Sequence, residues 1–312
     1  MIKQILEYPN FLVIGAGKSG TTSVYHYLKQ HPEVFMSEVK EPNFFALEGV
    51  TKINGYTESD PEGFNHYPWA VTNLIDYKSL FNNVGHQKAV GESSTMYQYM
   101  EKAPANIKKY IPNAKLIAIF RNPVDRLYSR YLHLAREDRE PTKKFEDCLI
   151  KGNIWWQKND LIQEGFYFTH MKRYFEDFDH DKIKIFLYED LKDNPKKLIK
   201  EMYQFLEIDD SFEPDMTIRY NVSGKIKNRF FNQLIGQKSI LKNTVATISP
   251  FLFRILKNSK QFKKSVTNLR VKNLSRPPIK EETRRRLINE VYRDEILNFQ
   301  KLIGRDLSTW LE

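Results

Sequence analysis

A short glycine-rich segment near the start of the chain combines the residue types that bind phosphate. It covers residues 15–22 and reads Gly-Ala-Gly-Lys-Ser-Gly-Thr-Thr, between an apolar run and a helical pattern. Glycines at such a turn let backbone N–H groups and the helix N-terminus surround an anion. The segment therefore predicts a phosphate-binding loop. The residues that would contact the anion are Lys18, Ser19, Gly20, Thr21 and Thr22.

The loop departs from the Walker A pattern at one position. A Walker A loop carries a lysine directly before its final Ser or Thr, where the ammonium contacts the β- and γ-phosphates. Thr21 stands there in this chain, and the lysine comes earlier, as Lys18. We therefore rank a nucleotide kinase or nucleoside triphosphatase below a protein that binds a different activated phosphate. For this segment taken alone, an ordinary glycine-rich turn is a further alternative.

A second block pairs an arginine at the end of a strand with a serine on the next helix. Residues 116–120 form a continuous apolar run, Arg121 follows directly, and Ser129 comes eight positions later. An arginine there offers a planar fork to a phosphate, and a hydroxyl on the helix can donate to the same oxygens. The alternative is that Arg121 pairs with a nearby carboxylate and Ser129 is a neutral helix position.

Together the two blocks resemble the motifs of sulfotransferases that use 3′-phosphoadenosine 5′-phosphosulfate (PAPS), in particular the heparan-sulfate type and bacterial carbohydrate sulfotransferases. Residues 18–22 resemble the 5′-phosphosulfate loop and residues 116–129 the 3′-phosphate motif. Residues 40–45 (Lys-Glu-Pro-Asn-Phe-Phe), 91–94 and 303–310 extend the likeness over nearly the whole chain. The resemblance implies transfer of a sulfuryl group from PAPS to a hydroxyl or amine, with a carbohydrate, glycoconjugate or glycolipid as the expected acceptor.

The resemblance also implies roles for individual side chains. Lys18 would neutralise the charge that develops on the leaving oxygen, or would instead hold the phosphate without affecting the rate. Glu41 would be the base that removes the acceptor proton, with Lys40 tuning it. Glu92 is the second candidate for the base, although a structural hydrogen-bonding role is an equal alternative.

A third segment would close over the nucleotide. Ser223, Gly224 and Lys225 stand where the family has this loop, but the match is loose. Lys227 or Arg229 could equally make the contact.

The positive charge of the chain is concentrated in one late segment. The formal net charge is +10, and residues 216–280 contain fifteen Lys and Arg and no Asp or Glu. Within it, residues 244–264 mix apolar side chains with lysines, as expected of an element that lies on an anionic membrane or glycan, or of a basic cover over the site. A non-catalytic binder of anionic glycans or membranes is therefore our third hypothesis. No nucleic-acid-binding motif accompanies the charge, so we expect no nucleic-acid partner.

Apolar periodicity indicates the elements that would position these residues. Three short apolar runs, at residues 11–14, 116–120 and 183–187, are each followed by a helical pattern, the third opening at Asn194-Pro195. Strands that alternate with helices predict a parallel sheet covered on both faces. We expect an α/β, P-loop-like three-layer fold in a single domain over residues 1–312, with a surface insertion at 46–77 and residues 216–280 covering the site.

Other residues exclude several functional classes. The seven histidines are scattered, and His86 is expected on the surface, so we expect no metal. Cys148 is the single cysteine and is expected to be half-buried and without a role. No apolar run approaches the roughly 18 residues of a membrane span, and the start lacks a signal-like region. We therefore expect a cytoplasmic protein.

Overall fold

A parallel sheet organises the chain in the computed structural model, which describes residues 8–50, 69–136, 139–217, 224–228, 265, 269 and 272–312. Its five strands run in the order β2-β3-β1-β4-β5, and every neighbouring pair is parallel. The strands are β1 (Phe11–Gly15), β2 (Val34–Met36), β3 (Ala89–Ser93), β4 (Lys115–Phe120) and β5 (Ile183–Leu187). The three apolar runs singled out in the sequence are therefore β1, β4 and β5.

The central strands β1 and β4 are buried on both faces of the sheet, which explains why they are continuous apolar runs rather than alternating ones. On β1, Leu12 and Ile14 pack into one hydrophobic core, whereas Phe11 and Val13 pack into the other. Side chains alternate across a strand, so one short run supplies both cores. Burial of this kind stabilises the fold by roughly 25 cal/mol for each Å² of apolar surface removed from water.

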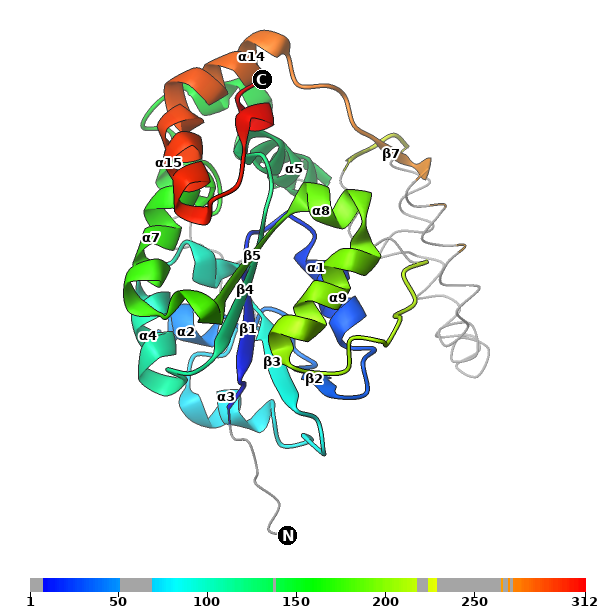
Figure 1. Cartoon of the computed structure of the whole chain (residues 1–312). Helices are drawn as coiled ribbons and strands as arrows, with labels where there is room; N and C mark the ends of the chain where they lie inside the picture. The colour runs from blue at the N-terminus through cyan, green and yellow to red at the C-terminus, as the bar shows by residue number, and fades with distance from the viewer. Residues whose placement is uncertain are drawn as a thin grey trace, which may run out of the picture.

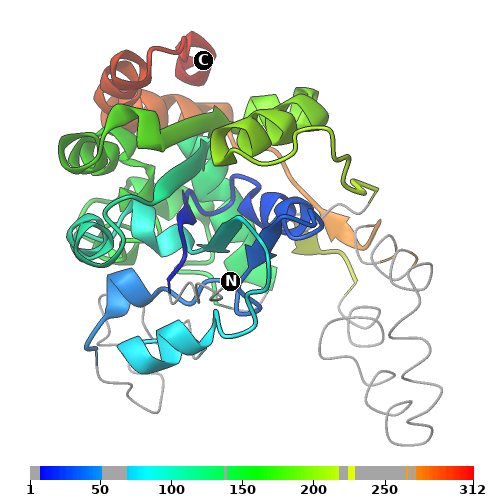
Figure 2. The same cartoon turned by 60° about the horizontal axis from the view of Figure 1, so that its bottom comes forward.

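Helices cover the two faces, as Figures 1 and 2 show. α1 (Thr21–Leu28) and α9 (Pro195–Leu206) supply the smaller core, while α4 (Lys102–Tyr110), α5 (Pro123–Arg136) and α7 (Tyr167–Asp177) supply the larger one. This arrangement confirms the predicted three-layer α/β fold. α9 begins as the sequence indicates, because Asn194 accepts a hydrogen bond from the N–H of Lys197 and a proline follows it.

The C-terminal part of the chain adds a further helical layer beside α7. It comprises α14 (Glu281–Arg286), a π-helical segment η6 (Leu287–Tyr292), α15 (Arg293–Ile303) and η7 (Ser308–Leu311). The remaining short helices are α2 (Phe44–Leu47), α3 (Leu74–Ser79), η2 (Thr95–Gln98), η3 (Phe145–Leu149), α6 (Ile154–Gln157), η4 (Gln163–Gly165), η5 (His180–Lys182) and α8 (Tyr188–Asp193). Across the described ranges, no helix is long and apolar enough to cross a membrane.

The ends of segment 46–77 differ from the surface insertion that the sequence predicts. Ala46 and Leu47 lie in α2 and are buried, and Ala70 and Tyr77 are fully buried as well. These side chains are drawn into the larger core because their apolar and aromatic surfaces complete it. Residues 51–68, the middle of the segment, lie outside the described residues.

A two-stranded antiparallel sheet stands apart from the main one. β6 (Lys225–Ile226) pairs with β7 (Leu274–Ser275). Figure 1 shows β7 at the upper right of the molecule, away from the five-stranded sheet. Most of the basic segment 216–280, including residues 244–264, lies outside the described residues. β6 lies near the start of this basic segment and β7 near its end, so their pairing brings the two ends of the segment together.

Candidate functional site

Two neighbouring strands of the sheet end side by side, where an open α/β sheet is expected to form a crevice for its ligand. β1 leads into the glycine-rich loop, and β4, which pairs with β1, leads into Arg121. The chain leaves β1 toward β2 and β3 on one side, and leaves β4 toward β5 on the other. Ligands of open α/β sheets bind where the strand order reverses in this way, so the topology brings the two predicted phosphate motifs together.

The start of the glycine-rich loop is hydrogen-bonded to the sheet, and the end of the loop leads into the uncapped N-terminus of α1. The N–H of Ala16 donates to the carbonyl of Ile119 at 2.8 Å. Lys18 and Gly20 then adopt left-handed φ angles of 66° and 98°. Because α1 has no side-chain cap at Gly20, its first N–H groups are offered to an anion at the helix N-terminus.

Ser19 fits an anion at this position. Its side chain is fully buried, and its Oγ has no hydrogen-bond partner among the described residues. Buried hydroxyls are almost always hydrogen-bonded in folded proteins. A phosphate oxygen bound by the loop would accept the hydrogen of Ser19, so the loop is suited to the group that the sequence predicts. Thr21 is buried beside it and Thr22 is half-buried.

Gly20 is required for steric reasons. A Cβ atom at this position would lie 2.4 Å from Cδ2 of Leu191, and the left-handed φ already disfavours a side chain. The loop therefore packs directly against α8, which follows β5. Sequence reasoning did not identify α8, because a six-residue helix is too short to give a clear period.

Lys18 lies among several charges. Its pKa is lowered to about 7, mainly by burial and also by the positive charges of Arg130 and Arg136, whereas Glu41 and Glu164 oppose the shift. The ammonium is therefore poised near its titration point and is sensitive to any anion that binds beside it. These interactions also bring two predicted catalytic residues, Lys18 and Glu41, into one crevice.

Arg121 connects the two predicted phosphate motifs. It is 8% exposed, its Nη1 donates to the carbonyl of Lys18 at 3.5 Å, and its guanidinium lies 4.6 Å from the ring centre of Tyr188. Its nearest carboxylate, Asp125, is 3.9 Å away and forms a shorter ion pair of 2.6 Å with Arg284. Arg121 is therefore not neutralised by a tight ion pair. Ser129 is buried on α5, about two turns beyond it.

The predicted closing loop is described in part. Ser223 lies outside the described residues, whereas Gly224 precedes β6 and Lys225 belongs to it. A Cβ atom at Gly224 would lie 2.7 Å from Cβ of Leu274, so the glycine permits close packing against β7. β6 lies beside α5, which carries Ser129. Gly224 and Lys225 therefore lie at the side of the crevice where the sequence predicts the 3′-phosphate.

Arg276 is a candidate that the sequence analysis missed. Burial lowers the pKa of Arg121; Asp125 opposes this, and the positive charge of Arg276 adds to it, so Arg276 lies close enough for its charge to act on Arg121. Within the described part of the chain, no carboxylate forms an ion pair with Arg276. Two neighbouring cations indicate a site for a multiply charged anion. The signal in the sequence was an arginine within a stretch that lacks acidic residues.

Glu41 occupies a strained backbone position at the edge of the crevice. Its φ is 61°, and its N–H donates to the carbonyl of Ser93 at the end of β3. A left-handed conformation in a non-glycine residue costs on the order of 1 kcal/mol or more and is often found at functional sites. Lys40 forms an ion pair with Glu41 at 2.6 Å, and both side chains are 21% exposed. Glu41 is thus accessible to an acceptor.

Glu92 has the structural role that the sequence analysis kept as an alternative. Its Oε1 accepts hydrogen bonds from Tyr97 (2.6 Å) and Tyr77 (3.3 Å), and its Oε2 accepts one from Ser94 (2.8 Å). Burial raises its pKa to about 7, against the effect of these hydrogen bonds. Because the carboxylate is fully buried and surrounded by donors, it has no open side for an acceptor.

Two other predictions concern residues outside the crevice. His86 is exposed, in agreement with the expected surface position. Cys148 is fully buried rather than half-buried, and burial raises the pKa of its thiol to about 12, so it is not a reactive thiolate. Among the described residues, no group of three or more His, Cys, Asp or Glu could hold a metal ion.

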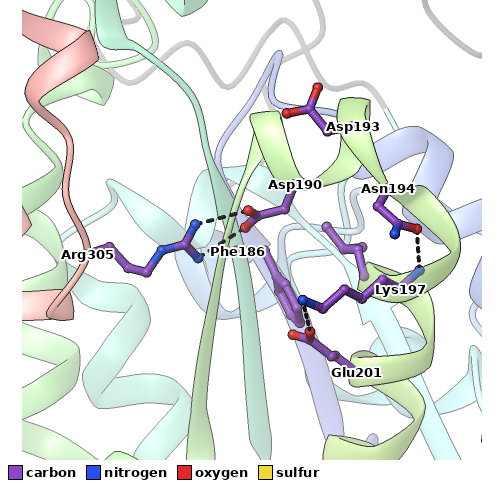
Figure 3. Close-up of a pocket in the computed structure, with 8 residues that line it drawn as sticks. Phe186, Asp190, Asp193, Asn194, Lys197, Glu201 and Arg305 are labelled. Carbon is purple, nitrogen blue, oxygen red and sulfur yellow. Dashed lines mark hydrogen bonds and ion pairs between the residues drawn. The ribbon is translucent and has the colours of Figure 1, made fainter.

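The C-terminal segment contacts α8 through a salt bridge. Arg305 donates to both oxygens of Asp190 at 3.0 and 3.2 Å, and Figure 3 shows this pair at the edge of a small pocket between α8 and α9. Lys197 and Glu201 form a longer ion pair on its other side, at 3.9 Å. Four of the charged groups that line this pocket therefore form two ion pairs, and the pair of Arg305 with Asp190 ties the C-terminal segment to α8.

Trp310, also in the C-terminal segment, connects α8 to Asn122, the residue that follows Arg121. Its indole N–H donates to Glu189 at 3.3 Å, and its carbonyl accepts a hydrogen bond from Asn122 at 3.1 Å. Tyr167 donates to the carbonyl of Arg121 at 2.9 Å. The position of Arg121 is therefore fixed from several sides.

Comparison with known proteins decides the family. The family model described as a sulfotransferase domain matches residues 8–226, most of the chain. The chain belongs to the sulfotransferase domain family. The match covers the glycine-rich loop, Glu41, Arg121 and Ser129, and it decides against the hypothesis of a nucleoside triphosphatase or kinase.

Named relatives support the same family. The bifunctional heparan sulfate N-deacetylase/N-sulfotransferase 4 of Mus musculus is 27% identical over 97% of this chain and 31% of its own length. Carbohydrate sulfotransferase 15 of Homo sapiens is 26% identical over 64% of this chain and 44% of its own length. The chain thus spans less than half the length of these relatives.

A solved structure confirms the fold of this sulfotransferase domain. The crystal structure of a sulfotransferase from Alicyclobacillus acidocaldarius superposes with a TM-score of 0.69 at 24% identity. It covers 98% of this chain and 99% of that chain. The predicted P-loop-like α/β architecture is therefore confirmed over nearly the whole length.

Proposed function

We propose that this sulfotransferase moves the sulfuryl group of PAPS to a hydroxyl or amine of a carbohydrate or glycoconjugate. The observation that carries the proposal is the hydrogen bond from Arg121 to the carbonyl of Lys18, which joins the two anion-binding motifs at one crevice. A nucleotide with phosphate groups at both its 5′ and 3′ positions matches two such motifs. The relatives named for heparan sulfate and carbohydrate support a sugar acceptor.

The loop after β1 would hold the 5′ end of the nucleotide. Its uncapped helix N-terminus supports this assignment, as does the hydroxyl of Ser19, which has no hydrogen-bond partner in the described part of the chain. The residues proposed for the 5′-phosphate are Lys18, Ser19, Gly20, Thr21 and Thr22.

The cationic side of the crevice would hold the 3′-phosphate. Among the described residues Arg121 has no tight carboxylate partner, and Arg276 lies close enough for its charge to act on Arg121. Arginine suits this task because its planar fork matches phosphate oxygens. The residues proposed for the 3′-phosphate are Arg121, Ser129, Ser223, Gly224, Lys225 and Arg276.

Lys18 and Glu41 would act on opposite sides of the transferred group. The nucleotide supplies the activated sulfuryl group when it is bound. The Lys18 ammonium would neutralise the negative charge that grows on the leaving side, which lowers the barrier most in a partly buried site. Glu41 would take the proton of the acceptor, because its carboxylate is accessible. Glu41 also lies close enough to Lys18 to raise the pKa of the lysine, which places it near the transferred group.

The proposal is tested first by nucleotide binding. Calorimetric titration with 3′-phosphoadenosine 5′-phosphate (PAP), the product that remains after sulfuryl transfer, is compared with titration with ATP. We expect PAP to bind with a Kd at least about a hundredfold below that of ATP, because only PAP carries the 3′-phosphate. Equal affinity for the two nucleotides would contradict the proposal.

The acceptor class is tested next with labelled PAPS. Oligosaccharides with free amino groups are compared with their fully N-acetylated forms, so that transfer to nitrogen and to oxygen are separated. Transfer to either form supports a carbohydrate acceptor. A protein that binds PAP but transfers to no oligosaccharide would retain the nucleotide assignment and lose the acceptor assignment.

A further inference from the structure

A buried ion pair lies directly beneath the glycine-rich loop. Glu164, in η4, is 3% exposed, and Arg126, on α5, is fully buried. Arg126 Nη1 contacts Glu164 Oε2 at 2.7 Å. Removing two charges from water is costly, and a pair of this kind is often no more stabilising than apolar residues of the same size. Stability alone is therefore a weak explanation for its presence.

The second oxygen of Glu164 binds the loop itself. Its Oε1 accepts a hydrogen bond from the N–H of Gly17 at 2.7 Å. A Cβ atom at Gly17 would lie 2.6 Å from the same oxygen, so the loop and the carboxylate are in close contact. The N–H of Gly17 is thus held by the protein, and the loop residues that follow it are the ones left to meet an anion.

Arg126 ties this contact to the helix that carries the other half of the site. Its guanidinium also donates to the carbonyls of Leu161 and Asp160. One turn later on α5, Arg130 pairs with the side chain of Asp160. The same helix carries Ser129 and begins just after Arg121, so the segment that holds Gly17 is fixed to the helix of the 3′-phosphate motif.

We infer that Glu164 is a positioning residue of this sulfotransferase: held by Arg126, it fixes the backbone of Gly17 so that the 5′-phosphate meets a preformed loop. The inference rests on the proposed function, because it assumes that the loop binds the 5′ end of the nucleotide. Preformed sites bind more tightly because less conformational freedom is lost on binding.

The charges around the pair are consistent with this role. Burial raises the pKa of Glu164, and the Arg126 guanidinium and the Gly17 N–H oppose the rise. Glu164 in turn helps to keep the neighbouring Lys18 protonated. Glu164 therefore acts on the loop in two ways, through the backbone of Gly17 and through the charge of Lys18.

Two double variants separate the hydrogen bond to Gly17 from the ion pair. Arg126→Met with Glu164→Gln removes both charges but keeps an acceptor for the N–H of Gly17. Arg126→Met with Glu164→Leu removes both charges and the acceptor. Neither variant leaves a buried charge without a partner, and both lose the contacts of Arg126 equally. The difference between them reports the contact with Gly17.

Affinity is measured for PAP and for adenosine 3′-phosphate, which lacks the 5′-phosphate. We expect the Leu variant to bind PAP about tenfold more weakly than the Gln variant, as the loss of one buried hydrogen bond implies. Adenosine 3′-phosphate should bind the two variants alike, within about twofold. A general loss of structure in the Leu variant would weaken its binding of both ligands equally. Equal affinities of the Gln and Leu variants for PAP would overturn the inference.

The wild-type protein provides a measurement that does not depend on the variants folding. Amide hydrogen exchange at Gly17 should be slow in the free protein, because its N–H is bonded to a buried carboxylate. Exchange as fast as in an open loop would overturn the inference. Failure of the wild-type protein to bind PAP would instead overturn the proposed function, so the two failures are distinguishable.

Discussion

Arg121 donates a hydrogen bond to the carbonyl of Lys18 across 3.5 Å, although the two residues lie 103 positions apart in the chain. The contact joins the end of β4 to the loop after β1, and it requires the two strands to be neighbours in the sheet. The guanidinium also lies over the ring of Tyr188, 4.6 Å from the ring centre, in a cation–π contact. One side chain thus connects the two motifs on which the proposed nucleotide site depends.

Arg121→Lys should bind PAP nearly as poorly as Arg121→Ala. A lysine keeps the positive charge but loses the planar fork, the stacking on Tyr188 and the contact with the loop carbonyl. We expect the Kd of PAP to rise by about 10- to 100-fold in both variants, the loss of one or two charge-assisted hydrogen bonds. Calorimetry checks this. The control is Arg285→Ala, which removes an exposed positive charge from α14. Full retention of affinity in Arg121→Lys would show that charge alone matters.

Binding of PAP should become weaker as the pH rises above 7. Lys18 has a pKa of about 7 in the free protein, and a bound phosphate would raise it by stabilising the ammonium. PAP therefore binds the protonated form more tightly, so affinity is highest below pH 7 and falls at higher pH, with a proton taken up on binding. The proton uptake is measured at pH 8 by calorimetry in buffers of different ionisation enthalpy.

Lys18→Met tests whether this proton belongs to Lys18. The variant should take up less than about half as many protons as the wild type at pH 8. The same uptake in both proteins would assign the proton to another group, and unchanged affinity for PAP would remove Lys18 from the site.

Local patterns in the sequence predicted the parts of the fold that depend on local physics. Buried parallel strands are mostly apolar, so β1, β4 and β5 could be identified, and Asn194-Pro195 marked the start of α9. The phosphate loop followed from the spacing of glycines between a strand and a helix. These features need only neighbouring residues, and the structure confirms the elements.

The parts that sequence reasoning missed depend on contacts between distant residues. Glu164 and Gly17 are 147 positions apart, and nothing near Glu164 marks it as a partner of the loop. The burial of Glu92 depends on Tyr77, which the sequence analysis placed in a surface insertion. Glu92 consequently looked like a second base, although its surroundings make it a structural carboxylate.

Arg276→Ala should weaken the binding of PAP without affecting the binding of a ligand that lacks the 3′-phosphate. The charge of Arg276 acts on Arg121, so it would act on the 3′-phosphate rather than on the loop after β1. We expect the Kd of PAP to rise about tenfold, whereas that of adenosine 5′-phosphosulfate should change by less than about twofold. Both are measured by calorimetry. An equal loss for the two ligands would place Arg276 elsewhere in the crevice.

Glu41→Gln should abolish transfer while leaving nucleotide binding intact. The amide cannot accept the acceptor proton, and the loss of a general base lowers rates by about 10²- to 10⁴-fold. The rate is measured with labelled PAPS and whichever oligosaccharide serves as acceptor, and PAP affinity is measured in parallel. Glu38→Gln, an exposed glutamate that pairs with Lys29, is the matched control. A variant with normal turnover would exclude Glu41 as the base.

Glu92 should make the protein less stable as the pH rises from about 4.5 to 7. Its pKa is raised to about 7 in the folded state from an ordinary value of 4.5, so the folded protein holds a proton that the unfolded chain has released. The stability linked to this proton is complete below pH 4.5 and is lost as the pH passes 7, by roughly 3 kcal/mol. Glu92→Gln removes the titration but keeps an acceptor oxygen for the hydroxyl groups of Tyr77 and Tyr97. Urea unfolding at several pH values should therefore give a shallower dependence of the unfolding free energy on pH in the variant than in the wild type. Parallel curves for the two proteins would show that Glu92 does not titrate in this range.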